Sequence, residues 1–384
     1  AVSYEKQLAF KDRKVKNNLI RIGGFAPDFV EEIMEAPVGM EHPFHYRNKA
    51  QFPVGMDKNG RLIAGFYAGR THTIIENRDC ALGVAENKIV LDIVLDFCTE
   101  KKIPAYDETT GKGLLRHVLI RKGFSTGQIM VCLILNGSSF AAEQELADRL
   151  FEKVPGMTSF SVNSNTERTN VIMGRKTRTI RGKDRIEDTI GGLVFTISPQ
   201  SFYQVNPVQT ELLYGKAIAY AALTGNETVV DAYCGTGTIG IIAAKSAKKV
   251  IGVELNRDAV RDAVKNAKCN NVKNIEFYNA DAGQFMVEMA EYRADAKRGE
   301  KSGADEVDVV FMDPPRAGSD EAFLSSVVTL APKRVVYVSC NPETLARDVK
   351  YLTKHGYEAK ECRPFDMFPF TDNTENVIAL VRQV

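Results

Sequence analysis

Short apolar runs alternate with amphipathic stretches through the second half of the chain, and this alternation constrains the fold more than any other feature. The apolar runs predict strands at 228–231, 250–254, 275–278, 307–313 and 334–339. The stretches between them predict helices at 239–246, 257–269, 321–330 and 342–354. Strands that alternate with helices form a parallel sheet with helices packed against it. We therefore predict an α/β domain with a Rossmann-like sheet.

The last two predicted strands distinguish between the proteins that share such a sheet. The runs 357–365 and 377–381 are strand-like and have no helix between them. They predict an antiparallel hairpin at the end of an otherwise parallel sheet. That ending is typical of the class I S-adenosylmethionine methyltransferase fold and not of a dehydrogenase.

The first half of the chain has a different pattern. An amphipathic helix is predicted over 3–22 and ends at Gly23-Gly24. From residue 45 to about residue 188, strand-like and helical stretches mix as in an α+β domain. We predict domain boundaries of 1–188 and 189–384, with packing of the 1–30 helix on the second domain as a further option.

Composition excludes several classes of protein. With 44% hydrophobic and 26% charged residues, the chain has the composition of an ordinary globular protein. There is no run of 18 apolar residues, and the first residues lack a signal-peptide pattern, so we expect a cytoplasmic protein that does not contact a membrane. The seven cysteines include no CxxC pair, and we expect reduced thiols and no metal site.

Basic residues are concentrated in one short segment. The net charge is only +1, yet six of the eleven residues from 175 to 185 are Lys or Arg. Such a run is either a solvated hairpin or a surface that binds the phosphates of a nucleic acid. Arg175, Lys176 and Arg178 are the candidate phosphate ligands.

A glycine-rich turn follows the strand predicted at 228–231. Gly235, Gly237 and Gly240 match the GxGxxG pattern of nucleotide-binding folds. Glu254 ends the next strand, where an acid accepts hydrogen bonds from ribose hydroxyls. These features fit NAD and S-adenosylmethionine equally well.

Two carboxylates favour S-adenosylmethionine over NAD. Asp231, at the tip of the strand before the glycines, would repel a pyrophosphate and suits a ligand with a cationic amino-acid end. Asp313-Pro-Pro-Arg316 follows the fourth strand, and its prolines hold the backbone carbonyls in a rigid rim. We expect S-adenosylmethionine because both features occur in one chain.

The residue after Pro315 bears on which atom is methylated. Methyltransferases that modify exocyclic amines usually carry an aromatic residue there, whereas this chain has Arg316. Methylation of a pyrimidine C5 instead needs a thiolate that first adds to C6. Cys340 fits, because it ends the fifth strand just before a helix whose dipole is expected to lower the thiol pKa. Cys234 is the alternative, but we expect it to pack behind the cofactor.

A base must then remove the C5 proton. Glu375 lies in a polar loop that leads directly into the last strand, at the mouth of the predicted cleft. It is the leading candidate for this base, and Asp372 in the same loop is the second.

These motifs, in this order, resemble the uracil-C5 RNA methyltransferases, which form 5-methyluridine in transfer RNA or in large-subunit ribosomal RNA. The resemblance rests on motifs between about residue 199 and residue 376: Gln204-Val-Asn-Pro207, Asp231-Ala-Tyr-Cys-Gly-Thr-Gly237, Val253-Glu254, Asp313-Pro-Pro-Arg-Ala-Gly318, Ser339-Cys-Asn-Pro342 and the loop that contains Thr374-Glu375. Tyr46-Arg-Asn-Lys-Ala-Gln51 and the opening helix look like the branch that modifies 23S ribosomal RNA.

The resemblance implies roles for individual residues. It implies contacts with S-adenosylmethionine for Gln204, Tyr233, Glu254, Asp281 and Asp313. Cys340 would be the nucleophile, Glu375 the proton acceptor, and Arg316 would hold the flipped uracil. The first domain would bind RNA, with 23S ribosomal RNA as the expected partner, and the protein is expected to be a monomer.

The chain departs from the family pattern in two respects. Phe370 and Asn373 occupy positions where many members have histidine. Many ribosomal members also carry an iron–sulfur cluster bound by four cysteines. Only Cys80 lies where one of those cysteines would fall, so we expect neither a cluster nor any other metal.

Four other functions remain as alternatives. They are a transfer RNA uracil-C5 methyltransferase, an RNA cytosine-C5 methyltransferase, a noncatalytic ribosome-assembly factor that only binds RNA, and an NAD-dependent oxidoreductase. The cytosine enzymes typically carry a cysteine at the tip of the fourth strand, where this chain has Asp313-Pro-Pro315. A pure binding module would have no use for the complete set of cofactor and nucleophile residues.

Overall fold

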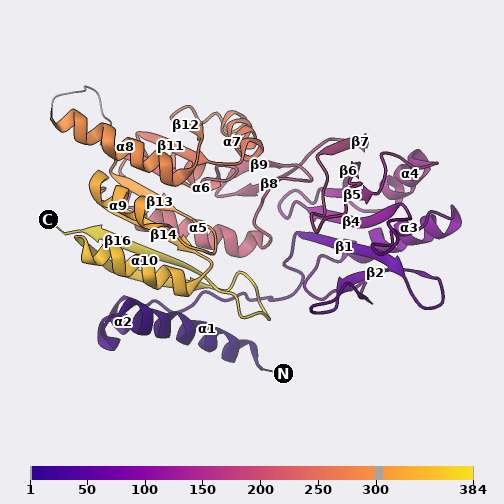
Figure 1. Cartoon of the computed structure of the whole chain (residues 1–384), viewed down its shortest axis with the longest axis horizontal. Coiled ribbons are helices and arrows are strands. Elements are labelled where there is room, and N and C mark those ends of the chain that lie inside the picture. Colours follow the sequence, from indigo (N-terminus) through magenta and orange to yellow (C-terminus); the bar gives the residue numbers. More distant parts are fainter. Residues whose placement is uncertain (1, 299–305, 384) are drawn as a thin grey trace. The chain divides into compact units, whose positions relative to one another are not determined.

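The computed structural model describes residues 2–298 and 306–383, and this part of the chain forms two compact units (Figure 1). The smaller unit consists of residues 44–189 and 196–207, and the larger unit of residues 1–43, 190–195 and 208–384. This division differs from the predicted boundary after residue 188. The first 43 residues lie in the larger unit because the apolar side of the opening helix packs there, and residues 196–207 return to the smaller unit.

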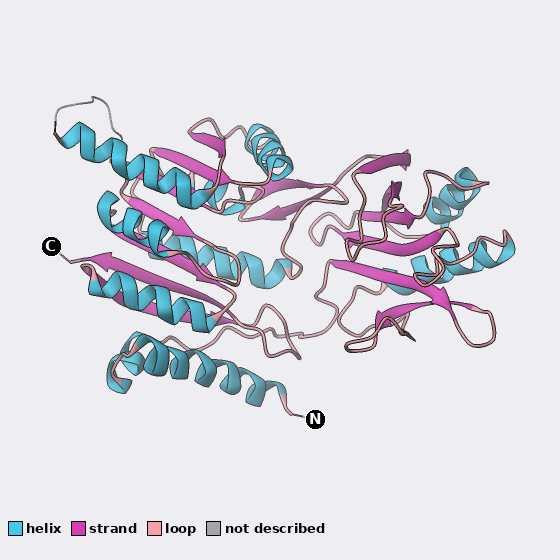
Figure 2. Ribbon diagram, viewed as in Figure 1, coloured by secondary structure: helices cyan, strands magenta, loops and turns pink. Residues whose placement is uncertain are grey.

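The larger unit contains a seven-stranded sheet with the strand order β12-β11-β10-β13-β14-β16-β15. Figure 2 shows the strands in magenta and the helices in cyan. The strands of this sheet are β10 (Thr228–Ala232), β11 (Lys249–Glu254), β12 (Ile275–Asn279), β13 (Val309–Met312), β14 (Arg334–Ser339), β15 (Tyr357–Phe365) and β16 (Glu375–Arg382). The first five run parallel, while β16 is antiparallel to both β14 and β15. The predicted parallel sheet with a terminal antiparallel hairpin is therefore confirmed.

Helices cover both faces of this sheet. They are α5 (Pro207–Ala221), α6 (Thr238–Ala243), α7 (Arg257–Cys269), α8 (Ala282–Lys297), α9 (Glu321–Leu330) and α10 (Pro342–Lys354). Buried apolar side chains of α8, α9 and α10 share one core with those of the central strands. Helices α6 and α7 pack on the opposite face (Figure 1). No pattern predicted α8, because its apolar residues are spread around the helix rather than gathered on one side.

The N-terminal segment packs against α10 in the same core. It consists of α1 (Tyr4–Asn18), a π-helical turn η1 (Leu19–Gly23) and α2 (Pro27–Ile33). Ser3 caps α1 by accepting a hydrogen bond from the amide of Lys6. Val15 and Leu19 are fully buried in the core of the larger unit, which fixes this segment beside α10. The predicted helix ends at Gly24, whose φ of 75° is the left-handed conformation that glycine adopts readily.

The smaller unit is an α+β structure with the strand order β3-β2-β1-β4-β5-β6-β7. Its strands are β1 (Lys49–Met56), β2 (Leu62–Tyr67), β3 (Ile74–Glu76), β4 (Leu115–Lys122), β5 (Ile129–Leu135), β6 (Met157–Ser164) and β7 (Lys176–Gly182). All neighbours are antiparallel except β5 and β6. Helices α3 (Glu86–Glu100) and α4 (Glu143–Lys153) pack on one face and complete its core. A separate two-stranded sheet, β8 (Ile186–Ile190) and β9 (Leu193–Ile197), lies where the chain passes from one unit to the other.

Among the described residues, no helix is both long enough and apolar enough to cross a membrane.

Candidate active site

The order of strands in the larger unit brings the predicted site residues to one edge of the sheet. Glu254 is the last residue of β11, Tyr233 and Asp313 directly follow β10 and β13, and Cys340 directly follows β14. Strand β16 runs in the opposite direction, so its first residue, Glu375, lies at the same edge. Ligands of open α/β sheets bind at this carboxyl edge.

The turn after β10 has the backbone geometry of a nucleotide-binding loop. Tyr233, Gly235 and Gly237 have φ values of 64°, 55° and 81°. A Cβ at Gly237 would come within 3.0 Å of the Phe277 ring and of Ala263, so only glycine fits there. A Cβ at Gly235 would meet no atom of the described residues within 4 Å, so there is open space beside this residue.

Glu254 and Asp231 brace this loop. The two carboxylate oxygens of Glu254 accept hydrogen bonds from the amides of Gly235, at 3.0 Å, and Asn256, at 2.7 Å. Asp231 is 1% exposed and accepts a hydrogen bond from the amide of Gly240 at 2.7 Å. The idea that Asp231 faces the ligand was therefore wrong, because its side chain is enclosed and holds the start of α6. Burial, and next to it the charge of Asp313, raises the pKa of Asp231 to about 8.

The remaining predicted cofactor ligands lie in several places. The Tyr233 ring packs on Phe323 with ring centroids 5.3 Å apart, and its hydroxyl lies 3.5 Å from that of Ser319. Asp281 is exposed and caps α8 by accepting a hydrogen bond from an amide of its first turn. Gln204 belongs to the smaller unit, where its carbonyl accepts a hydrogen bond from the Asn48 side chain.

Cys340 and Glu375 lie at the neighbouring ends of β14 and β16. Ser339 pairs with Asn376 in the antiparallel register, and the Asn376 amide donates to the Ser339 carbonyl at 3.2 Å. Cys340 follows Ser339 and Glu375 precedes Asn376, and the Glu375 carboxyl is close enough to raise the pKa of the Cys340 thiol. Asn341 then caps α10 by accepting from the amide of Glu343 at 3.0 Å.

The Cys340 thiol lies near the carboxyl groups of Glu375 and Asp313 and near the guanidinium of Arg316. Burial, followed by the Glu375 and Asp313 carboxyl groups, raises the pKa of the Cys340 thiol. Burial also raises the pKa of Asp313 to about 7, and burial together with Asp313 raises that of Glu375 well above its ordinary value. Arg316 is the cation that opposes these shifts at both Cys340 and Glu375. The prediction of a lowered thiol pKa was wrong, because burial and the two carboxyl groups raise the pKa of Cys340.

Glu375 is a strand residue, whereas the sequence pattern placed it in a loop. It pairs with Phe365 of β15 and is 6% exposed. The second candidate base, Asp372, is exposed in the preceding loop, where its carbonyl accepts a hydrogen bond from the Lys14 ammonium at 3.0 Å. The buried position of Glu375 beside Cys340 distinguishes it from Asp372.

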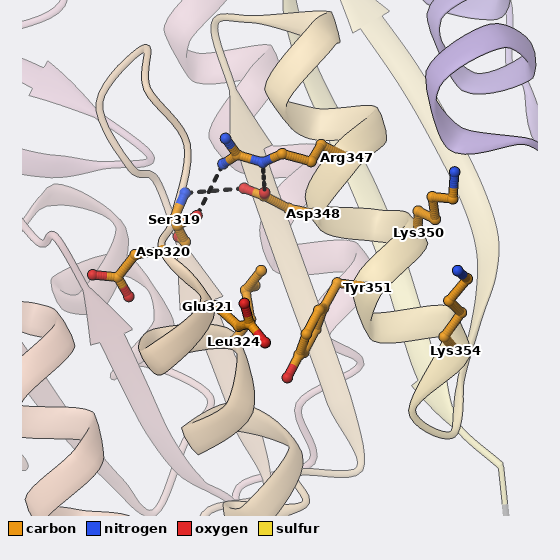
Figure 3. Close-up of a pocket in the computed structure, with 9 residues that line it drawn as sticks. All are labelled: Ser319, Asp320, Glu321, Leu324, Arg347, Asp348, Lys350, Tyr351 and Lys354. Atoms are coloured by element: carbon orange, nitrogen blue, oxygen red, sulfur yellow. Dashed lines mark hydrogen bonds and ion pairs between the residues drawn. The ribbon is translucent and has the colours of Figure 1, made fainter.

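The loop after Asp313 is held by α10. The Arg316 carbonyl accepts hydrogen bonds from the side chains of Asn341, at 3.0 Å, and Thr344, at 3.4 Å, while its guanidinium reaches the Asn373 side-chain oxygen at 3.4 Å. Farther along the loop, Figure 3 shows Arg347 and Asp348 of α10 pointing at Ser319 in the wall of a cavity of about 410 Å³.

Asp348 is the central residue of the contact between α10 and the loop at Ser319, and no sequence motif predicted this role. It is fully buried and accepts hydrogen bonds from the Ser319 amide at 2.9 Å and from the Tyr337 hydroxyl at 2.8 Å. Arg347 binds the same carboxylate and also donates to the Ser319 carbonyl at 2.9 Å. Ser319 and Asp348 are 29 residues apart, so no local pattern in the sequence could reveal this brace.

The opening helix holds the segment that leads into Glu375. The Lys11 ammonium lies 2.5 Å from the Asp366 carboxylate and 3.1 Å from the Phe368 carbonyl, and both charged side chains are at most 2% exposed. The Gln7 side chain accepts a hydrogen bond from the amide of Phe370 at 3.1 Å. Phe370, where the family often has histidine, is thus held by α1.

The candidate phosphate ligands lie on and beside β7 in the smaller unit. Arg178 forms a two-pronged ion pair with Glu143 of α4, with both distances 2.9 Å. Arg181 pairs with Asp148 of the same helix and stacks on Phe151. Arg175 and Lys176 are exposed and have no acidic partner among residues 2–298 and 306–383.

Cys234 lies in the glycine-rich loop after β10, between Tyr233 and Gly235. Cys234 is 8% exposed, and its sulfur would lie 3.2 Å from a Cβ at Gly252, so its side chain packs against β11. Burial raises its thiol pKa. Within the described part of the chain, no group of three or more His, Cys, Asp and Glu side chains is placed to hold a metal ion.

The residues present fit a nucleoside cofactor. The space beside Gly235, the carboxylate of Glu254 next to it and the aromatic ring of Tyr233 form the usual surroundings of such a ligand at a strand edge. The fold and this edge together define an S-adenosylmethionine-dependent methyltransferase.

Comparison with known proteins identifies the family. Residues 126–383 match the model of the tRNA (uracil-5-)-methyltransferase family. RNA methyltransferases of unestablished function from Caldanaerobacter subterraneus and Halalkalibacterium halodurans are 44% and 45% identical, over 99% of this chain and 80% and 79% of their own lengths. The chain therefore belongs to this family and is an S-adenosylmethionine-dependent RNA (uracil-5-)-methyltransferase.

One solved structure is similar along nearly the whole chain. It is the tRNA (uracil-54, C5)-methyltransferase of Pyrococcus abyssi in complex with S-adenosyl-L-homocysteine, with a TM-score of 0.78 and 28% sequence identity. The match covers 99% of this chain and 84% of that chain. The resemblance carried by the sequence motifs is thus confirmed at the level of the family.

Proposed function

We propose that this enzyme methylates C5 of a specific uridine in 23S ribosomal RNA through a covalent bond between Cys340 and C6 of the base. The observation that supports this mechanism is the pairing of Ser339 with Asn376, which brings the adjoining residues Cys340 and Glu375 to neighbouring strand ends at the carboxyl edge. Ribosomal RNA is favoured by the Tyr46–Gln51 segment and the opening helix. Transfer RNA is the second candidate, because the similar Pyrococcus abyssi enzyme is a tRNA methyltransferase.

In the proposed mechanism, the target uridine leaves its stack and enters the edge beside Arg316. Once Cys340 and Glu375 have lost their protons to solvent, the Cys340 thiolate attacks C6, the C5–C6 double bond opens, and its electron pair makes C5 nucleophilic. S-adenosylmethionine would supply the methyl group as an electrophile, and Tyr233, Glu254, Asp281 and Asp313 of the larger unit are the residues that would hold it. Glu375 then takes the C5 proton, the C5–C6 double bond re-forms, and Cys340 leaves as a thiolate.

The pKa shifts of Cys340 and Glu375 bear on how these two groups become ionised. Burial raises the pKa values of both Cys340 and Glu375, so in the free enzyme both groups hold their protons more tightly than the free side chains do. The thiol is then a poor nucleophile towards solvent and oxidants. Arg316 favours the ionised forms, so its position against the base would help to activate the sulfur where the uridine binds.

The smaller unit is the proposed RNA-binding unit. Arg175 and Lys176 have exposed charges without acidic partners in the described structure, which suits contacts with phosphates. Arg178 is engaged with Glu143, so an RNA phosphate would have to compete for its guanidinium. Among the three predicted phosphate ligands, we rank Arg175 and Lys176 first.

Two variants test the mechanism. Cys340→Ala is expected to bind S-adenosylmethionine with the wild-type Kd and to form no 5-methyluridine. Glu375→Gln is expected to methylate once and then retain the RNA in a covalent adduct that survives denaturing gel electrophoresis. Cys269→Ala and Glu361→Gln, which alter exposed residues of the same unit, are matched controls and should behave like the wild type.

The substrate is tested with separate RNA fractions. Ribosomal and transfer RNA from cells that lack the enzyme are incubated with it, and 5-methyluridine is mapped by mass spectrometry. We expect 5-methyluridine in 23S RNA. If only transfer RNA is modified, the enzyme is a transfer RNA methyltransferase instead. An active Cys340→Ala enzyme would rule out the covalent mechanism in either RNA.

A further inference from the structure

We propose that a cavity in the smaller unit, lined by Arg47, Lys49, Phe66 and Asn87, binds one unstacked nucleotide of the RNA substrate at a position other than the methylated uridine. This inference rests on the proposed RNA methylation and extends it to a second point of recognition. RNA is read mainly through bases that have left their stack, and such bases are held by aromatic rings and by side-chain hydrogen bonds.

The cavity lies along a free edge of strand β1. Strand β4 pairs with β1 from Lys49 to Pro53, whereas β2 pairs with it only from Val54 onwards. The first half of β1 therefore has a strand on only one side. On the other side lies a cavity of about 590 Å³, within the range of small-molecule sites. Its wall also includes Cys80, Leu82 and Gly83, which precede α3 in the chain.

Asn87 is the residue that points to a ligand. It forms part of the cavity wall, is only 2% exposed, and neither its side-chain nitrogen nor its oxygen has a hydrogen-bond partner among the described residues. A buried amide normally finds partners, because leaving one without them costs free energy. The amide offers one donor and one acceptor side by side, which matches the edge of a nucleobase. Gly83 leaves room for this amide, since a Cβ there would lie 2.4 Å from the Asn87 nitrogen.

Cations supply the second element of the site. Arg47 and Lys49 both line the cavity, and the described residues include no acidic partner for either. Burial, followed by the charges of Arg121 and Arg47, lowers the pKa of Lys49 to about 8. Neighbouring positive charges lower one another's pKa, and an anion bound between them stabilises their charged forms. A nucleotide phosphate supplies that anion, and an uncharged metabolite would not.

Aromatic rings supply the third element. Phe66 is 37% exposed, and its ring centroid lies 5.2 Å from that of Phe52, which is buried. Both rings line the cavity. In this combination, the half-exposed ring can stack on the face of a base and the unpaired amide can bond to its edge. The two cations can bind the phosphate of the same nucleotide.

The decisive variant is Asn87→Leu, which removes the amide and keeps the branching of the side chain at Cγ. The RNA fraction that the wild type methylates is used as substrate, and the KM for RNA is expected to rise about tenfold or more, as for loss of one bidentate base contact. Because Asn87 has no partner in the free protein, its unfolding temperature should not fall. Asn59→Leu, in the exposed turn after β1, is the matched control and should leave the KM unchanged.

A second pair of variants addresses the phosphate. Lys49→Met is expected to weaken RNA binding and to reduce the slope of log Kd against log salt by about 0.7 to 1. Lys58→Met removes the same charge from the exposed turn and should change neither quantity. Half-buried Cys80 gives a direct readout of occupancy, because bound RNA should slow its alkylation by iodoacetamide several-fold while exposed Cys269 reacts as before.

The outcomes separate this inference from the proposed function. If the wild type methylates no RNA fraction, the proposed function fails and the inference with it. If the wild type methylates RNA but Asn87→Leu keeps the wild-type KM, or Cys80 is alkylated at the same rate with and without RNA, the nucleotide site alone is refuted. A lower unfolding temperature for Asn87→Leu would also refute it, because it would show that the amide has a structural role.

Discussion

Replacement of Lys11 by Met should destabilise the larger unit far more than a surface substitution does. The Lys11 ammonium and the Asp366 carboxylate lie 2.5 Å apart with exposed fractions of 2% and 0%. Burial lowers the Lys11 pKa although Asp366 opposes this, so the ion pair is enclosed in a medium that disfavours lone charges. Removing one partner leaves the other charge buried, which costs about 3 to 5 kcal/mol. For a unit of this size, that corresponds to a fall in Tm of about 10 °C.

Urea and thermal unfolding of the full chain, followed by circular dichroism, measure this loss. Lys14→Met is the matched control on the same helix and should cost less than about 1 kcal/mol, because Lys14 lies near the surface. The double variant Lys11→Met/Asp366→Leu should recover most of the loss, since it leaves no buried charge. A Lys11→Met protein within about 1 kcal/mol of the wild type would refute the reasoning.

Two further predictions concern titration. Arg316→Gln removes the cation that lowers the pKa values of Cys340 and Glu375. The single-turnover methylation rate should therefore rise with pH over a more alkaline range than in the wild type. An unchanged pH profile would show that Arg316 does not affect the pKa values of these groups. The pKa of Asp231 is about 8 in the folded protein and near 3.8 when unfolded, so its contribution to stability is complete below pH 4 and is lost as the pH rises through 8. Asp231→Asn should therefore reduce the fall in unfolding free energy between pH 5 and pH 8.5, and equal slopes for variant and wild type in urea titrations would contradict this.

The sheet and its reactive edge could be predicted because their signals are local. Each strand of the larger sheet is a short apolar run followed by a turn, and the parallel order then brings the strand ends together. The apolar run that ends at Ser339 is therefore enough to place Cys340 at the edge. The sequence also marks Glu375, but as a loop residue, because nothing in Thr374-Glu375-Asn376 indicates that the last strand begins two residues before its apolar run.

Contacts between distant segments could not be predicted. Lys11 and Asp366 are 355 residues apart, and a lysine in a basic amphipathic helix gives no sign that it is buried. The same holds for Arg178, whose charge suggested RNA but whose position on β7 turns it towards Glu143 of α4. In each case a charged side chain has an intramolecular partner that only the fold brings near.

The Cys340 thiol shows why the chemistry of the site was easier to infer than its electrostatics. A helix N-terminus favours the thiolate by about 0.3 to 1 kcal/mol, which is less than one pKa unit. Burial and two carboxyl groups act in the opposite direction, and the pKa rises. Both carboxyl groups come from other strands, so the balance is set by Asp313 of the β13 edge and Glu375 of the β16 edge. One short motif therefore identifies the nucleophile. Its reactivity depends on residues at the ends of three strands and on the nearby cation Arg316.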